Sequence, residues 1–176
     1  KAKEHGTAIS FDLNYRASFW KGREEELRAT FTEIAGLCDI LYGNEEDFQL
    51  CLGIPGPEAG GEAIGAKIDS FKEMIGRIRE AYPQASYIGT SLREVVSANR
   101  HEWGMVLWGD GDFHVAELRE IDVIDRIGGG DGDAAGLATT RLGVGDEGCP
   151  VMVAAGHHRG FGHRPLQDGA HLRLVD

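Results

Sequence analysis

Three consecutive glycines, Gly128–Gly130, constrain this chain more than any other stretch. The apolar and acidic run Ile121–Ile124 precedes them, and Asp131 and the small residues Ala134–Gly136 follow. This pattern predicts a strand, a glycine turn and the first turn of a helix. Bare glycine backbone lets a ligand approach its N–H groups closely, and a helix N-terminus adds unpaired donors and a positive dipole end. The stretch is therefore a candidate anion site.

Asp131 follows the last glycine directly, so its carboxylate would stand beside the bound anion. That pairing fits a base that takes a proton from a hydroxyl nucleophile while the N–H groups hold the charge of a transferring phosphoryl group. The structural alternative is a tight turn in which Asp131 is a helix N-cap. The short glycine-aspartate motif alone leaves both interpretations open, because such motifs have many false matches.

Short apolar runs alternate with amphipathic stretches along the rest of the chain. The predicted strands are Thr7–Phe11, Cys38–Tyr42 and Ser86–Thr90, and the predicted helices cover Glu24–Leu37 and the stretch from Ile68 to Tyr82. Asp110-Gly111 predicts a hairpin turn between Trp103–Trp108 and Phe113–Ala116. The order of elements predicts an α/β fold, a doubly wound, mostly parallel sheet flanked by helices, with ligands at the strand ends.

The composition narrows the class of protein. A net charge of −11 speaks against a nucleic-acid partner or an anionic membrane surface. The sequence contains no apolar run near the roughly 20 residues of a membrane span. Its three cysteines are expected to be reduced, mostly buried thiols of a cytoplasmic protein. A length of 176 residues suffices for one domain with a hydrophobic core. The oligomeric state is not fixed by the sequence, and a homo-oligomer is one alternative.

Polar residues follow the first two predicted strands. Asp12–Arg16 (DLNYR) comes after the first, and the guanidinium of Arg16 can hold a carboxylate or phosphate in bidentate geometry. A solvated loop explains this segment equally well. After the second strand, Asn44 is a candidate helix N-cap followed by acidic residues.

Several of these motifs together resemble one family. Asp125–Asp131 (DRIGGGD) followed by Ala135-Gly136 resembles the C-terminal signature of the ribokinase-like (PfkB-type) carbohydrate kinases. DLNYR and the segment TSLREV that begins at Thr90 resemble its 2-keto-3-deoxygluconate kinase branch. A polar lead-in to the hairpin explains the TSLREV segment equally well. Gly43–Asp47 (GNEED) resembles the N-x-x-E motif of the family. The resemblance runs from about Ile9 to Leu137 and covers the C-terminal part of such a kinase, so the N-terminal half is expected to be missing.

The resemblance implies an activity and a set of site residues. The activity is ATP-dependent phosphorylation of a sugar or sugar acid hydroxyl, with 2-keto-3-deoxygluconate converted to its 6-phosphate. Asp131 would be the catalytic base and a substrate contact, and Gly128, Gly129 and Gly130 would form the anion hole. The remaining implied roles are substrate contact by Arg16, nucleotide contact by Asn14, Asn44, Thr90, Arg93, Gly128 and Gly130, and a water-mediated contact to Mg²⁺ by Asn44 and Asp47.

Three features depart from the pattern of the family. Asp133 replaces an apolar residue, Asp47 replaces a glutamate, and the N-terminal half is absent. The missing N-terminal half, Asp133 and the atypical C-terminal tail favour the alternative of a truncated, catalytically inactive nucleotide-binding or structural fragment. The shorter side chain of Asp47 still fits a contact through water. We expect residues 1–137 to be the C-terminal part of a ribokinase-like kinase domain and residues 138–176 to be an atypical tail. Because this tail has neither sustained periodicity nor family resemblance, we hypothesise a shifted reading frame in the source gene.

Overall fold

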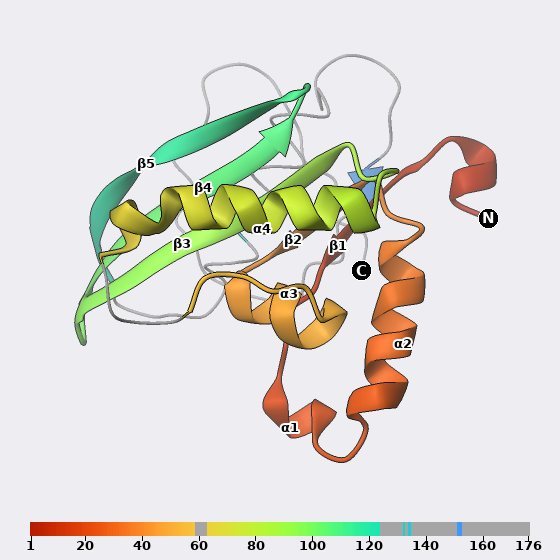
Figure 1. The fold of residues 1–176 in the computed structure, drawn as a ribbon, viewed down its shortest axis with the longest axis horizontal. Coiled ribbons are helices and arrows are strands. Elements are labelled where there is room, and N and C mark those ends of the chain that lie inside the picture. Colours follow the sequence, from red (N-terminus) through yellow and green to blue (C-terminus); the bar gives the residue numbers. More distant parts are fainter. Residues whose placement is uncertain (59–62, 124–131, 133, 135–150, 153–176) are drawn as a thin grey trace.

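The computed structural model describes residues 1–58, 63–123, 132, 134, 151 and 152 (Figure 1). The strands within them are β1 (Ala8–Asp12), β2 (Ile40–Gly43), β3 (Tyr87–Ser97), β4 (Arg100–Gly109), β5 (Asp112–Asp122) and β6 (Val151–Met152). The helices are α1 (Ala17–Trp20), α2 (Glu24–Ala35), α3 (Glu45–Leu52) and α4 (Ile68–Ala81), with short 3-10 turns at Lys3–His5 and Ile64–Lys67.

One sheet joins all the described strands, in the order β5-β4-β3-β2-β1-β6. Strand β1 pairs in parallel with β2 and β6, and β2 pairs in parallel with β3. The hairpin strands β4 and β5 extend the sheet antiparallel to β3. The predicted α/β fold with a mostly parallel sheet is therefore confirmed.

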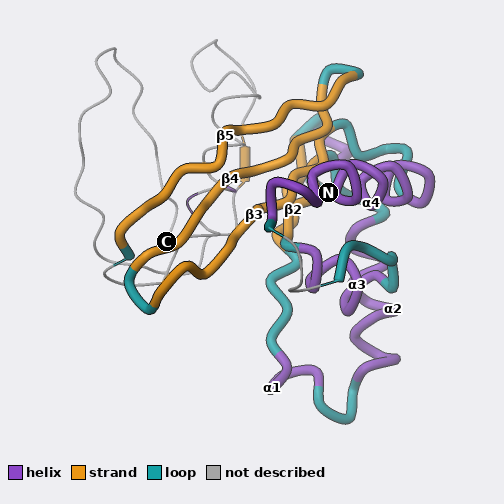
Figure 2. Tube along the Cα trace, turned by 60° about the vertical axis from the view of Figure 1, so that its left-hand side comes forward, coloured by secondary structure: helices purple, strands orange, loops and turns teal. Residues whose placement is uncertain are grey.

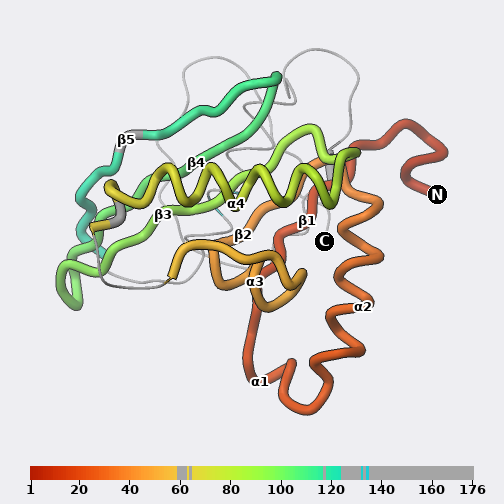
Figure 3. The backbone as a smooth tube through the Cα atoms, viewed as in Figure 1, coloured from red at the N-terminus to blue at the C-terminus, as the bar shows by residue number. Residues whose placement is uncertain are grey.

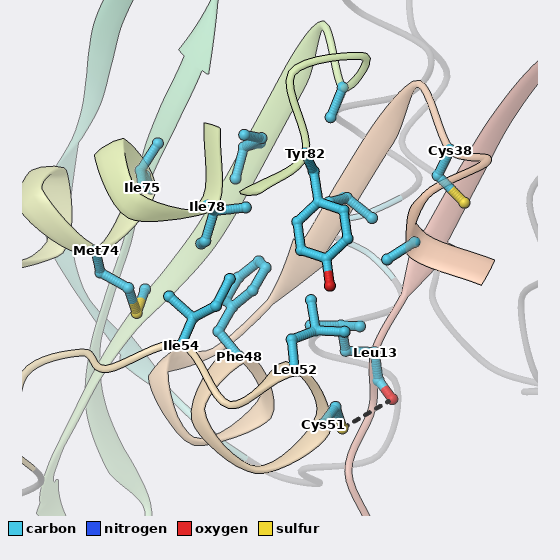
Figure 4. Packing of buried hydrophobic residues seen from close by; sticks show 14 of the residues in the cluster. Leu13, Cys38, Phe48, Cys51, Leu52, Ile54, Met74, Ile75, Ile78 and Tyr82 are labelled. Carbon is cyan, nitrogen blue, oxygen red and sulfur yellow. Dashed lines mark hydrogen bonds between the residues drawn. The ribbon is translucent and has the colours of Figure 1, made fainter. Parts of the chain in front are cut away.

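Helices α2, α3 and α4 lie on one face of the sheet, which the turned view shows most clearly (Figure 2). Helix α4 forms as its spacing predicts, because Phe71, Ile75 and Ile78 recur on one side and are buried. They pack against Leu41 of β2 and Ile88 of β3. Figure 4 shows side chains of α3 and α4 meeting in this core. The main core thus fills the space between the helices and the sheet.

The opposite face of the sheet carries a second, smaller core. Side chains alternate along a strand, so Ile40 and Tyr42 lie opposite their neighbour Leu41. They pack with Leu107 of β4 and with Ala134, which is buried. Gly132 and Ala134 are both helical, as the sequence predicts for the segment after Asp131. Ala134 therefore packs on the face that α2, α3 and α4 leave open.

The antiparallel part of the sheet is longer than the sequence predicts. Strand β3 continues past Thr90 to Ser97, because nine of its residues pair with β4. The segment Ser91–Glu94 is therefore part of the strand that leads into the hairpin. The two-residue turn at Asp110 and Gly111 is confirmed, with φ angles of 55° and 83°.

The structure adds one strand to the sheet that the sequence does not predict. Strand β6 falls in the 138–176 tail, where the sequence predicts no regular element; Val151 pairs with Ala8 and Met152 with Ile9. A strand this short is decided by its partner β1 and leaves no periodicity in the sequence. None of the helices in the described ranges is long and apolar enough to cross a membrane.

Candidate functional site

The chain segments that follow β1 and β2 lie side by side and are joined by hydrogen bonds. The backbone N–H of Leu13 donates to the carbonyl of Tyr42 at 2.9 Å, continuing the ladder beyond β1. Two residues later the backbone N–H of Tyr15 donates to Oδ1 of Asp47 at 2.8 Å. Figure 3 shows the chain passing α3 on its way from β1 into α1. The predicted Arg16 and Asn44 segments therefore share one edge of the sheet.

Helix α3 begins with a reciprocal cap. The side chain of Asn44 accepts a hydrogen bond from the backbone N–H of Asp47 at 2.8 Å, and Oδ2 of Asp47 accepts one from the backbone N–H of Asn44 at 2.8 Å. The predicted N-cap role of Asn44 is confirmed, and it uses the amide oxygen of the side chain. Asp47 thus contributes to the cap with one oxygen and to the β1 segment with the other.

Asp47 is a buried carboxylate, with 7% of its surface exposed. Burial raises the pKa of its carboxyl above the usual range, because the charged form loses hydration. The backbone N–H groups of Asn44 and Tyr15 and the charge of Arg16 act in the opposite direction without outweighing burial. The carboxylate therefore faces inward among backbone donors.

Arg16 and Asn14 are both exposed at this edge. Arg16 occupies the N-cap position of α1, and its Nη1 donates to the carbonyl of Tyr15 at 2.8 Å. The following helix is anchored by Trp20, whose ring lies 5.3 Å from that of Tyr15 and 5.0 Å from that of Phe31. Anchors on both sides of Arg16 leave its guanidinium facing solvent, where it can bind a carboxylate or phosphate.

The structure does not bring Thr90 and Arg93 to one place. Thr90 pairs with Gly43, next to Asn44, and is fully buried on the helix-covered face. Arg93 lies three residues further along the same strand, so its side chain points to the opposite face. There its Nε donates to Nδ1 of His101 at 3.3 Å, and its guanidinium lies 5.7 Å from the centre of the Trp103 ring.

The described residues give a hydrated magnesium ion a poor set of direct ligands. Within the described ranges no three acidic, histidine or cysteine side chains gather to hold a metal ion. The amide oxygen of Asn44 and both oxygens of Asp47 already accept backbone hydrogen bonds. Magnesium keeps several of its waters when bound, so these residues fit a contact through water and not direct coordination.

The glycine motif, Gly128–Gly130 with Asp131, lies outside the described residues, as does Asp133. The nearest described residues on either side are Val123 and Gly132. The backbone N–H of Val123, just past β5, donates to the carbonyl of Asn99 at 2.7 Å. On the other side, Gly132 is exposed and Ala134 is buried in the smaller core. Along the chain the motif thus lies between the end of β5 and Ala134, which packs on the face opposite α4.

Sequence reasoning missed the residues that act here through their backbone or their small size. Tyr15 contributes its N–H, and Leu13 contributes its carbonyl, which lies 4.0 Å from the thiol of Cys51 (Figure 4). Gly43 leaves room for Asp47, since an added Cβ would lie 3.0 Å from that of Asp47. The sequence signal that could have located this site is the order of the predicted strands, because loops that follow adjacent parallel strands meet at one edge of the sheet.

Comparison with known proteins decides the family. A model of the pfkB family carbohydrate kinases matches residues 1–146. The chain belongs to this family. The match includes every predicted site residue and confirms the resemblance that the motifs indicate. The position of the boundary at residue 137 and the origin of the tail stay predictions.

Two curated relatives are similar over about three quarters of the chain. The 5-dehydro-2-deoxygluconokinase of Clostridium tetani is 27% identical over 134 residues, which cover 76% of this chain and 34% of the relative. The enzyme of the same name from Geobacillus kaustophilus is 24% identical over 137 residues, covering 77% and 35%. The chain thus spans about a third of the length of these relatives.

Solved structures share the fold. The crystal structure of 2-dehydro-3-deoxygluconokinase from Thermotoga maritima matches with a TM-score of 0.67 and 29% identity, over 81% of this chain and 40% of that one. A PfkB family carbohydrate kinase from Listeria grayi matches with a TM-score of 0.62 and 27% identity, over 78% and 39%. Both support a ribokinase-like architecture for the described part.

Proposed function

We propose that the protein transfers a phosphoryl group from ATP to a hydroxyl of a sugar acid, with 2-keto-3-deoxygluconate (2-dehydro-3-deoxygluconate) as substrate and its 6-phosphate as product. The observation that carries the proposal is the family match over residues 1–146, which spans the site from Asn14 to Asp131. Three of the relatives above bear deoxygluconokinase names, which supports a deoxygluconate-type substrate.

In this proposal Asp131 is the base. Its carboxylate takes the proton of the sugar hydroxyl, whose oxygen then forms a bond to the γ-phosphorus of ATP. The bond between that phosphorus and the oxygen bridging to the β-phosphate breaks, and ADP leaves with the bridging oxygen. The amides of Gly128, Gly129 and Gly130 hold the negative charge of the transferring group.

Arg16 is proposed to bind the carboxylate of the sugar acid or a phosphate of ATP. Its exposed guanidinium beside the Asn44 segment supports this, because a planar fork matches either anion. Asn14, Asn44, Thr90 and Arg93 stay predicted nucleotide contacts. Magnesium, when bound, neutralises charge on the ATP phosphates, and Asn44 would contact it through water. For Asp47 the water-mediated contact stays a prediction.

The excess of acidic residues and the family membership both fit a cytoplasmic protein whose partners are small molecules. We propose no nucleic-acid partner, because a chain with a net charge of −11 repels the phosphate backbone. The proposal includes a homo-oligomer, and it assigns no surface of the chain to the contact between subunits.

The test is a coupled ADP-release assay with ATP, magnesium and either 2-keto-3-deoxygluconate or 5-dehydro-2-deoxygluconate. Asp131→Asn should reduce turnover by about 10²–10⁴, the range for loss of a general base. Asp122→Asn is the matched control, because it makes the same chemical change on a carboxylate that is 85% exposed. Turnover with the first sugar acid alone would fix the substrate as proposed.

Each other outcome has a defined meaning. Wild-type activity in Asp131→Asn would remove this residue as the base. Preference for 5-dehydro-2-deoxygluconate would correct the substrate and keep the reaction. A folded chain without turnover that still binds ATP and magnesium would be the alternative predicted from the sequence, an inactive nucleotide-binding fragment.

A further inference from the structure

The carboxylate of Asp47 connects two chain segments that are 32 residues apart in the sequence. One oxygen accepts the N–H of Tyr15 and the other accepts the N–H of Asn44, each at 2.8 Å. Hydrogen bonds from backbone N–H groups to a carboxylate are charge-assisted and stronger than those between neutral groups. One side chain thus joins the segment that carries Asn14 and Arg16 to the cap of α3.

The surroundings of Asp47 leave little room for another arrangement. The residue is 7% exposed, and Gly43 approaches it so closely that an added Cβ would stand 3.0 Å from its Cβ and 3.4 Å from its Oδ2. The same Cβ would lie 3.4 Å from Cδ1 of Leu13. Because the site is this tight, the carboxylate is held in the position where both amides reach it.

The segment after β1 depends on this contact. Strand β1 ends at Asp12, and its last ladder bond is that of Leu13 to Tyr42. Asn14 then adopts a left-handed φ of 43°, which is uncommon for a residue other than glycine. The helix that follows has four residues, too few to order the segment by itself. The Tyr15 N–H is therefore the point at which the segment is fastened to α3.

We propose that Asp47 is a positioning residue, which orders the Asn14–Arg16 segment through the N–H of Tyr15 and so holds Arg16 at the edge of the sheet where α3 begins. This role rests on the proposed kinase function and assigns Asp47 an action through its neighbours in place of contact with the metal. It also explains why an aspartate serves at this position, since both amides lie at 2.8 Å from the shorter side chain. A glutamate would have to place one more methylene beside Gly43.

The first test measures amide hydrogen exchange by NMR, without any substrate. Asp47→Asn keeps the shape of the side chain but replaces one accepting oxygen with an NH₂ group, so the Tyr15 or the Asn44 amide loses its acceptor. The exchange of that amide should accelerate about ten- to a hundredfold. Glu46→Gln, a neighbouring exposed carboxylate, is the control and should leave both rates unchanged. Unchanged rates in Asp47→Asn would overturn the proposal.

The same spectra report whether the variants fold, because the amides of Ile75 and Ile78 in α4 lie far along the chain from the contact and should stay protected. If Asp47→Asn does not fold, Gly43→Ala gives an independent test. That variant keeps the carboxylate but pushes its Cβ, so the Tyr15 amide should again exchange faster. A folded Gly43→Ala with wild-type exchange at Tyr15 would overturn the proposal as well.

The second test separates positioning from metal contact in the kinase assay. For a positioning residue, Asp47→Asn should lower kcat/KM for the sugar acid about tenfold or more and leave the half-saturating magnesium concentration unchanged. Asp47→Glu should recover little of this loss, because its longer arm does not fit. A shifted magnesium dependence in Asp47→Asn, together with full activity in Asp47→Glu, would assign Asp47 to the metal. Since the exchange test needs no turnover, failure of the kinase proposal and failure of this one are distinguishable.

Discussion

Gly43 and Asp47 lie so close together that a Cβ on Gly43 would stand 3.0 Å from the Cβ of Asp47. Gly43 is the last residue of β2, and Asp47 lies in the first turn of α3. Its carboxylate reaches Tyr15 beyond the end of β1. The absence of a side chain at one position thus lets a carboxylate at another join the segments that follow two strands.

We expect Gly43→Ala to destabilise the fold, because few real contacts of a Cβ are as short as 3.0 Å and the strand and helix must move apart. The free energy of unfolding, measured with urea, should fall by about 1–3 kcal/mol. Gly76→Ala is the control: Gly76 lies inside α4 with nothing within 4 Å of an added Cβ. That substitution should raise stability by about 0.5–1 kcal/mol. Equal effects of the two changes would contradict the close packing at Gly43.

Trp20 should be much more important for stability than the neighbouring Phe19. Trp20 is 4% exposed and packs between Tyr15 and Phe31, whereas Phe19 is 72% exposed. Trp20→Ala should cost about 3–5 kcal/mol in urea unfolding, because it leaves a cavity between α1 and α2. Phe19→Ala should change stability by less than about 0.5 kcal/mol. A comparable loss in both variants would show that α1 is not anchored through Trp20.

The buried thiols predict a loss of stability at alkaline pH. Burial raises the pKa of Cys38 to about 11 and that of Cys51 to about 12, from 9.0. As the pH rises past 9, the unfolded chain releases these protons first, so the free energy of unfolding falls and continues to fall until the folded thiols ionise. Between pH 8 and pH 10 the drop should be about 1–3 kcal/mol.

The control for the alkaline effect is the double variant Cys38→Ala, Cys51→Ala. Tyrosine and lysine side chains also titrate near pH 10, so the quantity to compare is the difference in pH dependence between this variant and the parent chain. Both should carry Cys149→Ser, since Cys149 lies outside the described residues. Identical pH dependence in the two proteins would rule out the thiols as its cause.

Local sequence signals predicted the elements that depend on neighbours along the chain. The apolar spacing of Phe71, Ile75 and Ile78 gave helix α4, and Asn44 gave the start of α3. Asp110-Gly111 gave the hairpin turn. Each of these signals works within one or two turns of backbone, so no knowledge of the tertiary fold was needed. The bounds were less accurate, since β3 runs on to Ser97 through pairing with β4.

The motif at Gly128–Asp131 and its supporting segments were enough to identify the family, and the segments after the first two strands identified Arg16, Asn44 and Asp47 as candidates. The hydrogen bond from the N–H of Tyr15 to Asp47, a contact across 32 residues, became visible in the folded chain alone. The same is true of Thr90 and Arg93, which face opposite sides of β3, and of Ala134, which packs on the second face of the sheet. Such contacts depend on which strands pair and in which register, and both are set by the packing of the whole sheet and not by neighbours along the chain.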